Sequence, residues 1–123
     1  MKLDDPAFEI VFFERLVEAR PHYVEALTAL AEVYTQEEHY QKGLHVDLRL
    51  SELCPEDETV FYNLACSYAL TDQKDLALDC LGRAIDLGYD DFRHMRKDSD
   101  LISLHQDERF LELLESRKRG AQP

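Results

Sequence analysis

The chain has 123 residues, and its 26 Asp and Glu against 14 Lys and Arg give a formal net charge of −12. This length suits one domain with its own core, and 45% hydrophobic with 33% charged residues is typical of a globular protein. Only four Gly and four Pro are present, which disfavours an all-β fold, since such folds need many tight turns. The negative charge disfavours binding to nucleic acid or to an anionic membrane, because both carry phosphate groups.

The cysteines and the N-terminal sequence predict a reduced, cytoplasmic protein. Cys54, Cys66 and Cys80 are odd in number, widely spaced and without a CxxC pair, which favours neither a disulfide framework nor a zinc site. The first residues are acidic and include Pro6, where a signal peptide would need an apolar run. No segment approaches the roughly 20 apolar residues that a membrane-spanning helix requires.

The first predicted element is a helix over residues 7–20, which precedes Pro21. Nine of its residues are apolar and they surround the helix, a pattern typical of a helix that is buried on all sides. Phe8, Val11 and Phe12 lie away from the face that the next helix can cover. We expect a homodimer through these three side chains, or else an upstream helix in a longer chain that would cover them.

Residues 22–55 and 56–89 repeat one pattern of side-chain sizes at an offset of 34 positions. The offset pairs Pro21 with Pro55, Leu27 with Phe61, Leu30 with Leu64, Ala31 with Ala65, Tyr34 with Tyr68, and Gly43 with Ala77. This order of residue types resembles the tetratricopeptide repeat. The resemblance covers residues 7–89 and implies an all-α fold, a right-handed superhelical stack of antiparallel helix pairs.

The physical pattern agrees with helix pairs. Small residues such as Ala31 and Gly43 let facing helices approach closely, and Pro55 cannot continue a helix. In the second unit, Asp57 and Asp72 stand where helix N-caps are expected. The stripe expected on the last helix of this unit consists of Leu76, Ala77, Leu81, Ala84 and Ile85.

Asp47 departs from the pattern, because a large apolar residue is expected midway along the second helix of residues 22–55. Either Asp47 is partly exposed, or the helix is rotated so that Leu44 and Leu48 carry the packing. We favour the rotation, since burying an unpaired carboxylate costs several kcal/mol.

Residues 90–117 resemble the closing segment that follows the last repeat in bacterial tetratricopeptide proteins, and residues 118–123 are expected to form a short tail. The resemblance implies capping helices that cover the end of the stack. The side chains expected to cover the core there are Phe92, Leu101, Leu104, Phe110, Leu113 and Leu114.

The resemblance further implies a binding scaffold, in which the first helix of each pair lines a concave groove for a peptide. With Leu27 and Phe61 fixed as the fourth residues of their units, the groove is expected to be acidic at its N-terminal end. Arg93, Arg96 and Lys97 would make its other end basic. The expected peptide-binding residues are Glu25, Thr28, Glu32, Gln36, Tyr62, Asn63, Cys66, Arg93 and Lys97.

Family members that grip a peptide's C-terminal carboxylates do so with Lys and Asn in the first helix, Asn in the second and Lys and Arg in the third. Asn63 matches the middle Asn, and Arg93 with Lys97 resembles the third-helix pair. The first-helix positions hold Glu25 and Ala29 instead, which disfavours a receptor for chaperone tails.

An enzymatic function is the weaker hypothesis. None of the five His forms an HExxH motif or a close Cys/His cluster, and the four Gly are isolated, so no catalytic residue, metal site or cofactor is predicted. The sequence therefore favours a non-enzymatic scaffold for a protein or peptide partner. The alternatives are a homodimerising assembly module and, third, a small helical enzyme.

Overall fold

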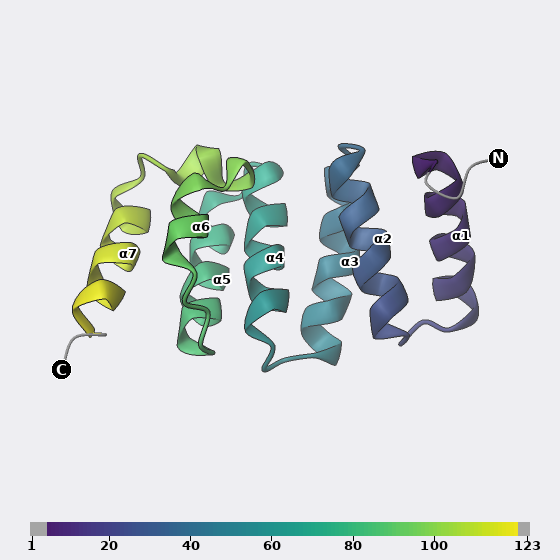
Figure 1. Ribbon diagram of the computed structural model, residues 1–123, viewed down its shortest axis with the longest axis horizontal. Coiled ribbons are helices and arrows are strands. Elements are labelled where there is room, and N and C mark those ends of the chain that lie inside the picture. The colour runs from purple at the N-terminus through teal and green to yellow at the C-terminus, as the bar shows by residue number, and fades with distance from the viewer. Residues whose placement is uncertain (1–4, 121–123) are drawn as a thin grey trace.

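The computed structural model describes residues 5–120, and the side chains of residues 5–115, and every element in that range is helical. The prediction of an all-α chain is confirmed. Figure 1 shows the helices side by side in chain order, with the two termini at opposite ends of the row. The elements are α1 (Pro6–Ala19), α2 (Val24–Gln36), α3 (Tyr40–Leu53), α4 (Glu58–Leu70), α5 (Lys74–Asp86), α6 (Phe92–Lys97), the 3₁₀ helix η1 (Ser99–Leu104) and α7 (Glu108–Gly120).

Successive helices pack against one another as contiguous pairs. Each helix from α1 to α4 contacts the next one in the chain, η1 returns to α4, and α7 contacts α5. Among the residues described, no helix is both long and apolar enough to cross a membrane.

The two helix pairs α2–α3 and α4–α5 repeat at the offset found in the sequence. Their first helices begin at residues 24 and 58, and their second helices at residues 40 and 74, a shift of 34 in both cases. The turns within the pairs repeat as well, because Glu38 and Asp72 both have a positive φ, of 62° and 64°. The backbone N–H that follows each of them donates to the carbonyl of Tyr34 or Tyr68.

One predicted N-cap is confirmed and the other is wrong. Asp57 caps α4, since its side chain accepts from the backbone N–H groups of Thr59 at 2.9 Å and Val60 at 3.2 Å. Asp72 does not cap α5, because it occupies the left-handed position of the turn. The N-cap of α5 is Gln73, which makes no side-chain capping bond.

The core of the C-terminal half is one continuous cluster that joins α4, α5, α6, η1 and α7. Leu76 was expected on the packed face of α5, but it is 44% exposed, and Leu78 is buried in its place. Leu78 belongs to the stripe that α5 shares with the closing helices. The four expected residues that are buried there are Ala77, Leu81, Ala84 and Ile85.

The closing helices bury the side chains expected of them. Leu101, Leu104, Phe110 and Leu114 are buried in the cluster, and Phe92 and Leu113 pack against it. Helix α7 continues to Gly120, so the first residues of the expected tail are helical, and residues 121–123 lie outside the described part of the chain.

The predicted rotation of α3 is wrong. Asp47 is only 4% exposed, and Leu48 is less buried than Leu44. The Ser67 hydroxyl on α4, itself buried, donates a hydrogen bond to Asp47 Oδ2. This partner on the neighbouring helix offsets part of the cost of burying the carboxylate. Burial nevertheless raises the pKa of Asp47 to about 6, although the Ser67 hydrogen bond acts to lower it.

The raised pKa of Asp47 predicts a pH dependence of stability. The folded state holds this proton more tightly than the unfolded state, so stability is lost as the pH rises from about 4 to about 7. A shift from 3.8 to about 6 corresponds to about 2–3 kcal/mol. We expect Asp47→Asn to match the parent in urea unfolding near pH 4 and to gain relative stability by pH 7. Asp79→Asn, at an exposed position of α5, is the control, and a pH-independent difference between Asp47→Asn and the parent would contradict this account.

Small residues set the spacing of each helix pair, which predicts opposite outcomes at two equivalent positions. A Cβ at Gly43 would meet Thr35 Oγ1 at 3.4 Å and Tyr34 Cβ at 3.6 Å, so a methyl group would make ordinary van der Waals contacts there. Gly43→Ala should be neutral or stabilise by up to about 1 kcal/mol, since alanine favours helix.

Ala77 is fully buried, and Ala77→Leu should cost about 1–3 kcal/mol through overpacking. Urea unfolding measures both, and an Ala77→Leu variant as stable as the parent would show that α4 and α5 are not closely packed there.

Candidate functional site

A cavity of about 450 Å³ lies between α2, α4 and the segment that joins α6 to η1. Its floor includes Asp47 of α3 and Ser67 of α4, the buried pair described above. Polar side chains one helical turn apart extend along its walls, from Thr28 through Glu32 to Gln36 on α2 and from Thr59 to Asn63 on α4. The helix pairs thus present a concave surface with polar side chains along its walls and a size that suits a ligand.

Six of the nine predicted peptide-binding residues line this cavity: Thr28, Glu32, Gln36, Tyr62, Asn63 and Cys66. Glu25, Arg93 and Lys97 do not line it, and all three are exposed elsewhere. Tyr62 and Cys66 are buried, whereas Glu32, Gln36 and Asn63 are exposed. The exposed residues are therefore the ones that can contact a ligand without rearranging the core.

The residues expected to form the basic end of the groove, Arg93, Arg96 and Lys97, do not line this cavity. Helix α6 has six residues and turns Met95 into the core, which leaves His94 on the cavity side and Arg96 beside α7. The residues that follow add Asp98 and Asp100 to the lining. The groove positions expected for Arg93 and Lys97 assume that the 34-residue repeat continues into α6, which is too short to keep it. The repeat pattern does not predict that Asp98 or Asp100 lies at the cavity.

Asp98 is the centre of a hydrogen-bonded network on the cavity wall. The Tyr62 hydroxyl donates to Asp98 Oδ2 at 2.6 Å, and His94 Nε2 lies 3.2 Å from the same oxygen. Asp98 Oδ1 accepts from the backbone N–H of Asp100 at 3.0 Å and so caps η1. Tyr62 also stacks on Tyr89, with ring centroids 4.3 Å apart and planes 3° from parallel. The network connects α4 to α6 through His94 and to η1 through Asp98 and Asp100.

Burial and negative charge dominate the electrostatics of this wall. Burial raises the pKa of the Asp100 carboxyl, the Asp98 charge raises it further, and His94 opposes the shift. Burial also raises the pKa of the Tyr62 hydroxyl, as does its hydrogen bond to Asp98. Both shifts mean that additional negative charge is disfavoured there, mainly because the wall is partly shielded from water and secondarily because Asp98 is already negative.

Cys66, Asp98 and Asp100 form the one group found among the described side chains that could hold a metal ion, with ligand atoms within 4.8 Å of one another. Metal binding needs the thiolate, whereas burial, followed by the charges of Asp98 and Asp100, raises the pKa of Cys66 well above its usual value. Both Asp98 oxygens already accept hydrogen bonds from Tyr62 and Asp100. Hydrogen bonding therefore explains the position of Asp98 without a metal ion.

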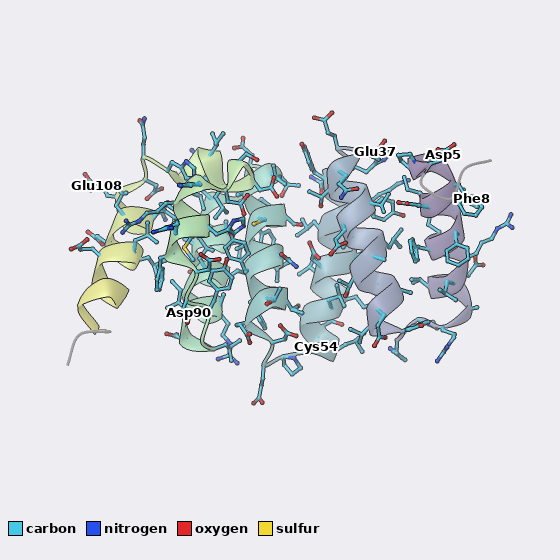
Figure 2. All side chains as sticks on the ribbon, viewed as in Figure 1. Asp5, Phe8, Glu37, Cys54, Asp90 and Glu108 are labelled. Carbon is cyan, nitrogen blue, oxygen red and sulfur yellow. The ribbon has the colours of Figure 1, made fainter. Side chains whose placement is uncertain are left out.

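The expected dimerisation residues lie on a second surface, at the α1 end of the molecule, where Figure 2 labels Phe8. Val11 is 47% exposed and Phe12 is 49% exposed, and Phe8 is partly buried. The rings of Phe8 and Phe12 stack with centroids 6.1 Å apart beside a shallow hollow on α1. Helix α1 packs on α2, to which it is joined by a hydrogen bond from the Tyr34 hydroxyl to Glu14.

Comparison with known proteins adds one partial similarity. No family model matches the chain. The chain is similar to a protein of Arabidopsis thaliana whose name describes it as chloroplastic, to which it is 38% identical over 65 residues. The match covers 52% of this chain, which spans about a fifth (19%) of the length of the Arabidopsis protein.

Proposed function

We propose that the protein is a non-enzymatic interaction scaffold of the tetratricopeptide type, which binds a peptide segment of a partner protein in the concave cavity. Its helix pairs form a right-handed superhelical stack in this proposal. The repeated helix starts and the repeated left-handed turns at residues 38 and 72 support it, because unrelated helix pairs would not share both. The predicted cytoplasmic location is part of the same proposal.

The observation that carries the proposal is the polar lining of the cavity by consecutive turns of α2 and α4. Glu32, Gln36 and Asn63 are exposed there and hold donors and acceptors that can pair with peptide backbone groups. An extended peptide needs such partners along its length, since each backbone N–H and C=O that loses water without a partner costs binding energy. The cavity can therefore pair with backbone groups along a bound peptide.

Substitution of Asn63 tests this function. Peptides selected from a random library on the intact chain should bind Asn63→Ala about 5–10-fold more weakly, the loss expected for one or two hydrogen bonds. Tyr62→Ala is a poorer probe, because Tyr62 is 4% exposed and stacks on Tyr89. Gln41→Ala, at an exposed position of α3 outside the cavity, is the control. Equal affinities for the parent and both variants, measured by calorimetry, would exclude the cavity as the peptide site.

A second candidate function is homodimerisation through α1. It is favoured by the adjacent positions of Val11 and Phe12, which are 47% and 49% exposed on one helix beside the partly buried Phe8. Burying a large apolar side chain stabilises by roughly 1.5–3 kcal/mol, so pairing Phe8, Val11 and Phe12 across a two-fold axis would be favourable.

Sedimentation velocity tests the dimer. We expect the parent to dimerise at tens of micromolar and Phe12→Glu to be monomeric, because a charge at the interface would be desolvated. Leu111→Glu is a matched control, since Leu111 of α7 is also 49% exposed and lies outside this surface. A parent that is monomeric at this concentration, with Phe12→Glu unchanged in sedimentation, would rule out this function.

A further inference from the structure

The cavity lining is acidic on every side. Glu32 belongs to α2, Asp47 to α3, Asp57 precedes α4, and Asp98 and Asp100 belong to the closing segment. None of the described residues that line the cavity is a lysine or an arginine. Carboxylates that converge on a concave surface reinforce one another's field, because the surrounding protein has a low dielectric constant.

None of these five carboxylates is paired with a lysine or arginine among the described residues. The ion pairs among the described residues join Arg109 to Asp75 and Asp107, and His94 to Asp98, the last only when the histidine is protonated. Glu32 and Asp100 take part in none of them. Asp100 is also partly buried, so its charge is less well solvated than that of a surface carboxylate.

The other carboxylates are engaged within the protein. Asp57 caps α4, Asp47 accepts from Ser67, and Asp98 accepts from Tyr62. These bonds fix the acidic groups in place without neutralising them, since hydroxyl and backbone donors carry no net charge. The cavity is thus preorganised for a cation, and its rigid carboxylates need little rearrangement on binding.

We infer that the cavity binds a basic segment of the partner, in which a lysine or arginine side chain reaches Asp100 beside Asp98 and a second cationic residue lies near Glu32. This inference rests on the proposed peptide-binding function and specifies the chemistry of the peptide. It differs from the expectation from sequence, in which the groove was acidic at one end and basic at the other.

Charge complementarity selects this occupant over others. An acidic segment would face Glu32, Asp98 and Asp100 without a compensating lysine or arginine on the lining. A guanidinium or ammonium group can form charge-assisted hydrogen bonds with Asp100, which are shorter and stronger than neutral ones. The net charge of −12 would also attract a basic segment from a distance and speed its association at low salt.

Nuclear magnetic resonance of the full chain with four short peptides tests the inference. The peptides have the same Ala, Ser and Gly framework and differ only in two positions, which are Arg, Lys, Gln or Glu. We expect the Arg and Lys peptides to shift the backbone amide signals of Glu32, Asn63 and Asp100. The Gln peptide should bind about tenfold more weakly and the Glu peptide more weakly still, and raising NaCl to about 0.5 M should remove most of the difference.

The second part of the experiment uses neutral variants of Glu32 and Asp100, two lining carboxylates without an ion pair. Glu32→Gln and Asp100→Asn should each weaken the Arg peptide by about tenfold and leave the Gln peptide unchanged. Glu37→Gln is the matched control, because Glu37 is exposed just after α2 and does not line the cavity. The amide spectrum of each variant verifies that it is folded.

The possible outcomes separate the two proposals. If the Gln or Glu peptide binds the cavity as tightly as the Arg peptide, or if Asp100→Asn and Glu32→Gln have no effect on the Arg peptide, the inference of a basic partner is wrong and the peptide site stands. If the peptides shift amide signals only outside the cavity, the proposed function fails together with this inference.

Discussion

The carboxylate of Asp98 joins the closing segment to α4, and the shape and charge of the cavity depend on that contact. Its two oxygens accept from the Tyr62 hydroxyl of α4 and from the backbone N–H of Asp100 in the first turn of η1. The same contact keeps Tyr62 stacked on Tyr89 and brings Asp100 to the cavity wall. Another polar contact between the part of the chain after α6 and the helix pairs is the exposed ion pair of Arg109 with Asp75 at 2.7 Å, which lies away from the cavity.

Helix α4 is central because it provides hydroxyl donors to acidic groups on both sides. Ser67 donates to Asp47 of α3, and Tyr62 donates to Asp98 of the closing segment. The helix is buried on more than one face, which is why its sequence lacks a clear polar stripe. A buried carboxylate and a neutral hydroxyl donor form a weaker pair than an ion pair does, so the negative charge persists beside the cavity.

The helices were predictable from the sequence, whereas the polar contacts that form the site were not. The 34-residue offset placed α2 to α5, because side-chain size and helical period are local properties. The partners of Asp47 and Asp98 lie 20 and 36 residues away in sequence, and a repeat pattern indicates which face a residue occupies but not which donor it meets. Arg93 and Lys97 lie outside the cavity for a related reason: the six-residue helix α6 is oriented by its buried side chain, Met95, rather than by a repeat.

An acidic cavity carries a cost in stability that a basic partner would relieve. Burial raises the pKa of both Asp47 and Asp100, so ionised carboxylates near the cavity destabilise the unbound fold at neutral pH. A bound cation favours the ionised form of Asp100 and binds only the folded state, which stabilises the fold through linkage. Binding strength and folding stability are therefore coupled through the same carboxylates. A substitution such as Asp100→Asn is expected to lower the affinity for a basic segment while it leaves the unbound protein as stable as before, or more so.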